Sequence, residues 1–465
     1  MPASNRPHRA KKFAVGCSTI FFVLLLVTVT TAVVLWTTAN RRASEELAAQ
    51  IARIRARGEP LTTPELNDFY KPAANRPDMT QEIIAALDLC DAPDRASLAV
   101  ALPIVGQGPE PPPVPQEWSQ IEAVEAYLDR FKEPIGIFHE VARRDGTVRF
   151  PIDFSPGIAT VLNHTQRLRQ AARVLSLEFH VNLHRGRTSE AVDSIVAQIG
   201  LVRTLDTEPT LISQLVRLAL TAVAMHNAQD LIRQADVSDG DLARLQQAVR
   251  KIEFLPSLKH ALAGERTFGY MGCIAPERMA ADAGAISPQE ARAIAMLAPK
   301  RVADAARMLE LNLRVAEAAD ESLLAALRAG QSGEKELSAL GQGMVDRMKY
   351  SLTLLLAPAY GTALKAFARN AARCECVDTA LAAELYRRQN GSWPPGLEEL
   401  VPKYLPAVPV DPFTGQSLKF IVADDEFKVY SVGEDGKEDG GKFSERMEPG
   451  TDLGFVVPMR RGEAP

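Results

Sequence analysis

The feature that most constrains this chain is a long uncharged apolar run near its N-terminus. Residues Phe13 to Thr38 contain no charged side chain. As a helix the run would extend about 39 Å at 1.5 Å per residue, which exceeds the roughly 30 Å hydrocarbon core of a bilayer. Trp36 lies near one end, where interfacial aromatic residues are common. A cleaved signal peptide has a shorter apolar region, so we expect a retained transmembrane helix over 13–38.

The charges on either side of this run predict its orientation. Four basic residues lie within residues 1–12, whereas Arg41 and Arg42 on the other side are soon offset by Glu45 and Glu46. Positively charged flanks favour the cytoplasmic side. We therefore expect a cytoplasmic tail over 1–12 and a single-pass protein of the cytoplasmic (inner) membrane, with its C-terminal body on the non-cytoplasmic side.

The composition of the body indicates a folded, mostly helical protein. Hydrophobic residues make up 46% of the 465 residues and charged residues 24%, so the chain can bury a core. Alanine and leucine are abundant and aromatic residues are only 6%, which favours helices over sheets. The net charge of −5 argues against nucleic acid as a partner, because phosphate binding needs a basic surface. The five cysteines show neither a disulfide framework nor a zinc-binding spacing.

Breaks in the apolar pattern divide the body into segments. A helical stalk is predicted over 39–58, followed by a small helical segment over 59–102. Prolines crowd residues 103–116, which predicts a semi-rigid linker. A helical domain is then expected over 117–375.

Apolar residues recur with a helical period through most of that domain. We predict a helical bundle or an irregular α-solenoid, in which short turns join antiparallel helices. Gly264–Ile286, rich in glycine and alanine, is expected to be a loop, and Ala329–Glu334 another break. The predicted helices span 117–144, 157–184, 188–205, 209–235, 238–263 and 287–329.

The pattern changes again over 376–465, where a small α+β module is expected. A helix is predicted to end at Asn390, with Gly391 as its terminating residue. Strands are expected at 417–421 and 427–431, joined at a hairpin tip formed by Asp424 and Asp425. The predicted fold class is therefore mainly α, with a transmembrane helix, a helical body and a C-terminal module containing a β-hairpin.

Several spaced motifs of this module occur in the order found in a known family. They are Tyr386…Asn390-Gly391-x-Trp393-Pro394, Asp411-Pro412-Phe413-x-Gly415 and Tyr430-Ser431-x-Gly433-x-Asp435-Gly436. In these motifs the module resembles the globular end of the G-type pseudopilin of type II secretion systems. The chain departs from that family because its anchor lacks a glutamate and a large helical body precedes the module.

The chain as a whole also resembles a group of membrane-anchored bacterial proteins, planctomycete-like in character. That resemblance rests on the Gly-Glu-Pro-Leu-Thr-x-x-Glu-Leu segment at 58–66, followed by the same C-terminal ending. It implies no particular activity.

The pseudopilin resemblance implies calcium binding in the loop that follows the second predicted strand. Asp435 matches the family position, and Asp439 and Asp452 are candidate additional ligands by their chemistry. Calcium prefers six to eight oxygen ligands, which carboxylates in a glycine-rich loop can supply. The alternative is a solvated acidic turn without a metal.

Other candidate chemistry in the sequence is weak. His180 and His184 share a helix face, but no glutamate stands at the spacing of a zinc hydrolase, so ordinary structural histidines are favoured. Neither a phosphate-binding loop nor a Gly-x-Ser-x-Gly motif occurs. We therefore expect a non-enzymatic envelope protein with a structural or protein-interaction role and protein partners. The alternatives are an accessory component of a type II secretion or pilus-like system, and an enzyme whose site is assembled within the helical domain.

Overall fold

The computed structural model describes the backbone of residues 8–72, 74–91, 99–297, 301–356, 358–423, 426–442 and 451–458. The expected hairpin tip at Asp424–Asp425, most of the expected tail 1–12 and the side chain of Trp36 lie outside the description.

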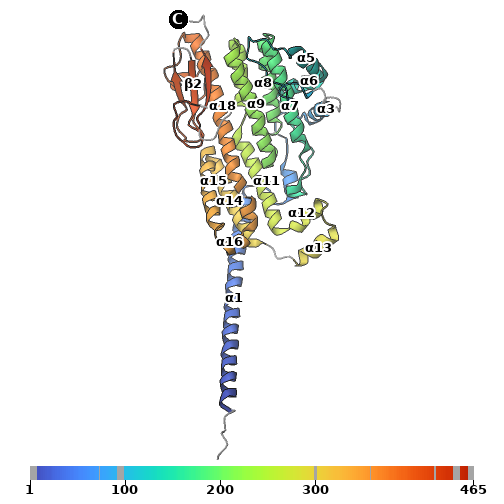
Figure 1. Cartoon of the computed structure of the whole chain (residues 1–465), viewed down its shortest axis with the longest axis vertical. Helices are drawn as coiled ribbons and strands as arrows, with labels where there is room; N and C mark the ends of the chain where they lie inside the picture. Colours follow the sequence, from blue (N-terminus) through green and yellow to red (C-terminus); the bar gives the residue numbers. More distant parts are fainter. Residues whose placement is uncertain are drawn as a thin grey trace, which may run out of the picture.

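The described chain is mainly helical, as predicted (Figure 1). A three-stranded antiparallel sheet lies near the C-terminus, formed by β1 (Lys419–Val422), β2 (Glu426–Ser431) and β3 (Leu453–Pro458). The helices are α1 (His8–Ala56), α2 (Thr63–Phe69), α3 (Thr80–Cys90), α5 (Ile121–Leu128), α6 (Lys132–Arg143), α7 (Asn163–His184), α8 (Thr188–Arg203), α9 (Leu211–Gln234), α10 (Asp239–Arg250), α11 (Phe254–Ile274), α12 (Pro276–Asp282), α13 (Pro288–Leu297), α14 (Val302–Glu321), α15 (Leu323–Leu340), α16 (Met344–Lys349), α17 (Ser351–Leu356) and α18 (Pro358–Asn390).

Helix α1 projects from one end of the body (Figure 1). Among the residues that the structure describes, it is the one helix long and apolar enough to cross a membrane, and its most apolar stretch is not buried. The expected stalk, 39–58, is not a separate element, because most of it continues α1. Its last turns are built into the body, where Leu47 and Ile54 share a core cluster with residues of α14. Arg53 also pairs with Glu317 of α14 at 2.6 Å.

The long helices of the body lie side by side along its length (Figure 1). A tight turn joins α7 to α8, and Gly186 adopts a positive φ of 70° there, which glycine tolerates without strain. Helices α7, α8 and α9 bury one apolar core that continues into the C-terminal module.

Two expected breaks in the helical domain were wrong. Gly264–Ile286 is not a loop, because α11 runs to Ile274 and α12 follows at once. Likewise, α15 passes straight through Ala329–Glu334. Two glycines of α11 allow close approach of other segments: a Cβ on Gly264 would lie 1.6 Å from the carbonyl oxygen of Pro209, and one on Gly269 would lie 1.9 Å from Met308.

The proline-rich segment 103–116 contains no helix or strand, but it lies against the helices. The backbone N–H of Val114 donates to the side chain of Gln234 at 2.8 Å. The carbonyl oxygen of Pro112 lies 2.8 Å from Nε2 of His184. The segment is therefore anchored at two points to α7 and α9.

The predicted hairpin is present as β1 and β2, with Phe420 opposite Val429. Strand β3, which was not predicted, pairs with β2 and places Phe455 opposite Val429. The expected boundary at 376 falls inside α18, which contacts α9 and α10 as well as β2 and β3. One helix thus belongs to both the helical body and the sheet module.

Candidate functional site

A groove lies where the helical body meets the C-terminal module. It consists of two adjoining hollows of about 430 and 490 Å³ that share Ile252, Phe254, Glu375 and Val410 as lining residues. The turn between α10 and α11 forms one wall, the middle of α18 forms the floor, and residues 405–415 form the other wall. Most of these side chains are apolar, and Val410 is 50% exposed.

Glu375 is the distinctive polar residue of this groove. Its side chain reaches solvent from α18, and no hydrogen bond or ion pair to its carboxylate is found among the residues that the structure describes. Desolvation by the surrounding protein raises the pKa of Glu375 to about 7, Asp378 adds to the rise, and Arg250 opposes it. Asp378 itself is engaged, because Arg250 Nε pairs with it at 2.8 Å. The groove therefore offers an unpaired carboxylate beside apolar walls.

Asp411 fixes the outer wall of the groove. Its buried carboxylate accepts hydrogen bonds from the backbone N–H of Phe413 at 2.8 Å and of Val432 at 3.0 Å, and from Ser431 Oγ at 3.0 Å. Gly415 closes the turn with a φ of 76°. The Asp-Pro-Phe-x-Gly motif thus fastens the 409–415 loop to the end of β2.

Apart from the groove, a separate hollow of about 490 Å³ lies between α6, α8 and α10. Its lining includes His139, Asp193 and Arg244. Its charges are largely neutralised within the protein. Arg244 pairs with Asp241 at 2.8 Å and with Asp193 at 3.3 Å. Burial lowers the pKa of His139, but the 3.0 Å contact with Glu178 outweighs it and leaves the pKa above its ordinary value. The charged side chains of this hollow are therefore paired within the protein, whereas the groove presents the unpaired carboxylate of Glu375 to a ligand.

A serine, a histidine and a glutamate meet in the interior, but not in the order of a hydrolase triad. Glu208 is fully buried and lies between the other two: His164 Nε2 is 2.9 Å from one of its oxygens, and Ser213 Oγ donates to the other. In a triad the histidine must lie between the serine and the acid so that it can take the hydroxyl proton. Phe150 stacks on the His164 ring at 4.2 Å. The cluster is arranged as a buried structural network.

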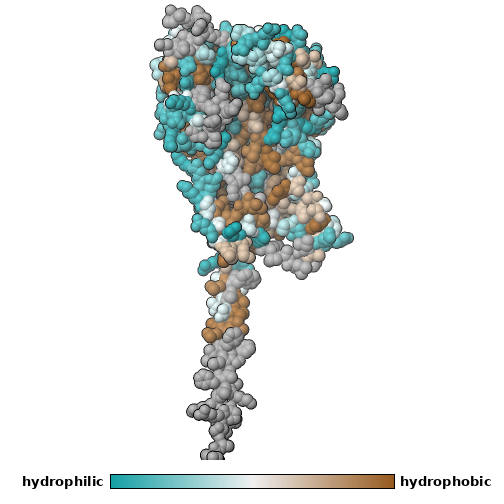
Figure 2. All heavy atoms as spheres, in the orientation of Figure 1, coloured by the Kyte–Doolittle hydropathy of each residue, from teal (hydrophilic) through white to brown (hydrophobic). Residues whose placement is uncertain are grey.

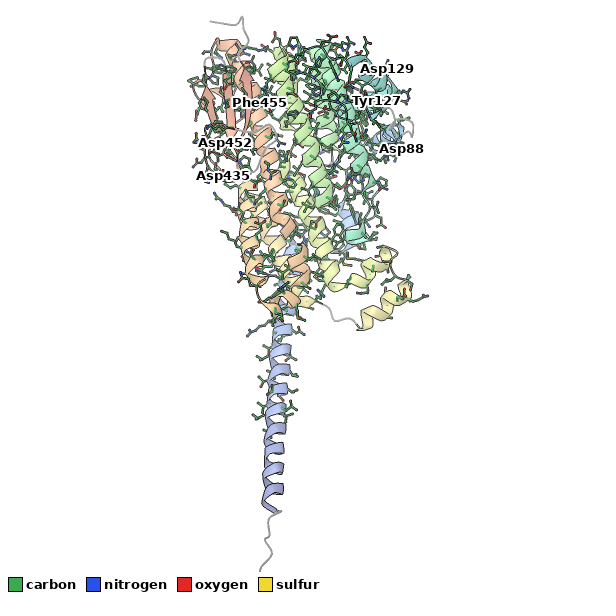
Figure 3. All side chains as sticks on the ribbon, in the orientation of Figure 1. Asp88, Tyr127, Asp129, Asp435, Asp452 and Phe455 are labelled. Carbon is green, nitrogen blue, oxygen red and sulfur yellow. The ribbon has the colours of Figure 1, made fainter. Side chains whose placement is uncertain are left out.

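The three candidate calcium ligands differ in their surroundings. Asp435 Oδ1 accepts from the backbone N–H of Lys437 in an exposed turn. Asp452 is buried. One of its oxygens accepts from the N–H groups of Asp439 and Gly441, and the other has no hydrogen-bond partner among the residues that the structure describes. Burial raises the pKa of Asp452. Figure 3 shows Asp435 and Asp452 on the same side of the C-terminal module.

These aspartates do not come together as a complete ligand set. Within the described ranges, no group of three or more histidine, cysteine, aspartate or glutamate side chains could hold a metal ion. Residues 443–450, in the same β2–β3 connection, lie outside the description.

His180 and His184 have separate structural surroundings. The ring of His184 packs at 5.1 Å from Trp118 and contacts the backbone of Pro112. Burial lowers the pKa of His180 to about 3. The sequence favoured ordinary structural histidines here, and the contacts of His184 have that character.

Comparison with known proteins adds no further identification: no family model, no curated protein and no solved structure matches this chain. The resemblance to the pseudopilin module therefore rests on the sequence motifs alone.

The groove was not found from the sequence, although one signal was present. Glu375 stands between Cys374 and Cys376, both of which are buried. Burial raises the pKa of the Cys374 thiol to about 12, which does not favour a metal-binding thiolate. A charged residue between two buried neighbours on a helix points to a polar opening in an otherwise covered surface.

Proposed function

We propose that this chain is a single-pass, membrane-anchored protein of the bacterial envelope that binds a protein partner and catalyses no reaction. The observation that carries the proposal is the groove around Glu375. Its apolar walls and free carboxylate suit a partner segment in which a lysine or arginine lies next to an apolar side chain. The long apolar part of α1 supports the anchor, and the basic flank at 1–12 supports a body on the non-cytoplasmic side.

The interaction is tested by site-specific photo-crosslinking in cells. A crosslinking residue at Val410 should yield a discrete adduct, whereas one at Val161, which is 70% exposed on another part of the body, should not. Glu375→Lys should abolish the Val410 adduct by repelling the basic partner, and Glu375→Gln should weaken it. An adduct unchanged by Glu375→Lys would remove the groove as the binding site.

The anchoring and its orientation are tested separately by adding protease to spheroplasts. We expect digestion of the body and survival of a membrane-embedded N-terminal fragment. Full protection of the body in intact spheroplasts would contradict the proposed orientation, and a chain recovered in the soluble fraction would contradict the anchor.

We also propose that the β2–β3 connection binds calcium, as the pseudopilin resemblance implies. The observation in favour is the buried oxygen of Asp452, which has no hydrogen-bond partner within the described part of the chain, because an unpaired buried acceptor is costly unless something satisfies it. Millimolar calcium, but not magnesium, should raise the melting temperature of the full chain, and Asp452→Asn should remove the increase. No shift with calcium in the parent chain would rule the site out.

A further inference from the structure

The end of the body nearest to α1 carries a cluster of exposed apolar side chains. Helix α16 lies at that end (Figure 1), and α17 contacts both α16 and α14. Met344 is 80% exposed, Val345 and Met348 are 77% exposed, and Leu355 is 72% exposed. Exposed apolar groups gathered on one part of a surface indicate a contact with a partner or a membrane. We call these four residues the apolar foot.

Helix α17, which carries Leu355 of the apolar foot, is held in place by α14. The buried carboxylate of Asp304, on α14, accepts hydrogen bonds from the backbone N–H groups of Leu352 and Thr353 at 3.0 and 2.9 Å, and from the Thr353 hydroxyl at 2.6 Å. Leu352 packs against the same core cluster that contains Leu47 and Ile54 of α1. The position of α17 is therefore fixed relative to α1.

The distance from the apolar run to the body is short. The run ends at Thr38, and Ala43, five residues further on, is the first buried side chain among those described on α1. Five residues of helix extend about 7.5 Å. A bilayer is about 40–45 Å thick in total and its hydrocarbon core about 30 Å, so the headgroup layer on each side is roughly 5–8 Å thick. The distance from the run to the body is therefore about the thickness of one headgroup layer.

The connection between run and body is also continuous. Helix α1 passes from Val23 to Ala56 without a glycine or proline, so no hinge interrupts it where it enters the body. Figure 2 shows apolar residues on α1 directly below the body. If the run spans a bilayer, this end of the body lies within reach of the headgroups.

The polar residues around the apolar foot suit a lipid surface. Arg347 and Lys349 are exposed on α16. On α1, Arg42 is also exposed, whereas Arg41 pairs with Glu45 at 2.9 Å. The Lys349 ammonium lies 4.8 Å from the centre of the Tyr350 ring. Basic and aromatic residues next to apolar ones are typical of segments that lie in the membrane interface.

We propose that the apolar foot inserts into the headgroup layer of the bilayer that α1 crosses, on the side of the body, with Arg347 and Lys349 contacting lipid phosphates. This inference rests on the proposed membrane anchor. It adds a second membrane contact, through which the base of the body lies directly on the lipid surface and the body keeps one orientation.

The test uses the full chain in nanodiscs of phosphatidylethanolamine and phosphatidylglycerol, one chain per disc. An environment-sensitive fluorophore is attached at Met348→Cys, with Val161→Cys as the exposed control and Leu26→Cys as the control within the anchor. We expect brominated lipid to quench the Leu26 and Met348 labels and to leave the Val161 label unchanged. Replacing Met344 and Val345 by serine in the labelled Met348→Cys chain should reduce quenching of the Met348 label without changing that of the Leu26 label.

Each other outcome overturns the proposal and identifies the step that fails. Quenching at Leu26 but not at Met348 would leave the anchor intact and remove the apolar foot. Quenching at neither position would remove the anchor and the foot together. Shielding of the Met348 label that requires two chains per disc would show that a second copy covers the surface instead of lipid.

Discussion

Asp411 and Ser431 are joined by a 3.0 Å hydrogen bond from the serine hydroxyl to the buried carboxylate, although they lie twenty residues apart. The same carboxylate accepts two backbone N–H groups, so Asp411→Ala would leave three donors without an acceptor, two of them buried. Each such group costs about 1–3 kcal/mol, and we expect a loss of about 2–5 kcal/mol in the free energy of unfolding. Denaturant unfolding of the full chain measures it. Asp435→Ala, in an exposed turn, is the matched control and should change stability by less than about 0.5 kcal/mol.

Glu375 should make stability depend on pH. Its pKa is about 7 in the folded protein against an ordinary value of 4.5, so the folded state binds more protons between these values. The protonated carboxyl group therefore contributes to the free energy of unfolding below about pH 4.5. This contribution is lost as the pH rises from about 4.5 to about 7. Glu375→Gln should flatten this part of the profile and melt higher than the parent chain at pH 8. Identical pH profiles for the two chains would contradict the raised pKa.

Arg217 is expected to be among the most sensitive residues of the helical body. It is fully buried, and its guanidinium pairs with Asp206 at 2.8 Å and donates to the carbonyl oxygen of Glu253 at 3.0 Å. Arg217→Ala removes these bonds and leaves a cavity, so we expect a loss of about 3–5 kcal/mol. Arg143→Ala, which removes an exposed pair with Glu140 and should leave stability almost unchanged, is the control. Equal effects of the two substitutions would argue against the buried network.

The buried serine should be unreactive. Ser213 is fully buried and donates its hydroxyl directly to Glu208, so His164, which contacts the same carboxylate, is not positioned to take the hydroxyl proton. A fluorophosphonate probe, which labels activated serines, should leave Ser213 unmodified in the folded chain. Labelling that disappears in Ser213→Ala would instead favour the alternative of an enzyme with its site in the helical domain.

The sequence predicted those elements whose signals are local. Asn390 followed by Gly391 ends α18 as expected, because a positive φ suits glycine there. The glycines of α11 were misleading: Gly264 and Gly269 allow close packing against other elements, a requirement that local sequence does not display. Strand β3 was missed although Leu453, Phe455 and Val457 alternate along it and are buried on one face.

The groove could not be predicted, because its walls come from distant parts of the chain. Ile252 and Val410 reach the same hollow only after α10, α18 and the Asp411 turn have packed together. The packing of the stalk against α14 could not be predicted either. The apolar spacing of Leu47 and Ile54 indicates a buried face, but it does not identify the helix that covers that face.

Helix α18 has a mechanical consequence. It is 33 residues long, or roughly 50 Å, and runs from Pro358, at the same end of the body as α16, to Asn390, beside the sheet (Figure 1). A partner that pulled on the sheet or on the groove would load this helix, together with α9, which also contacts β3. Tension applied beside the sheet would therefore reach the opposite end of the body, from which α1 emerges, without any rearrangement of the intervening helices.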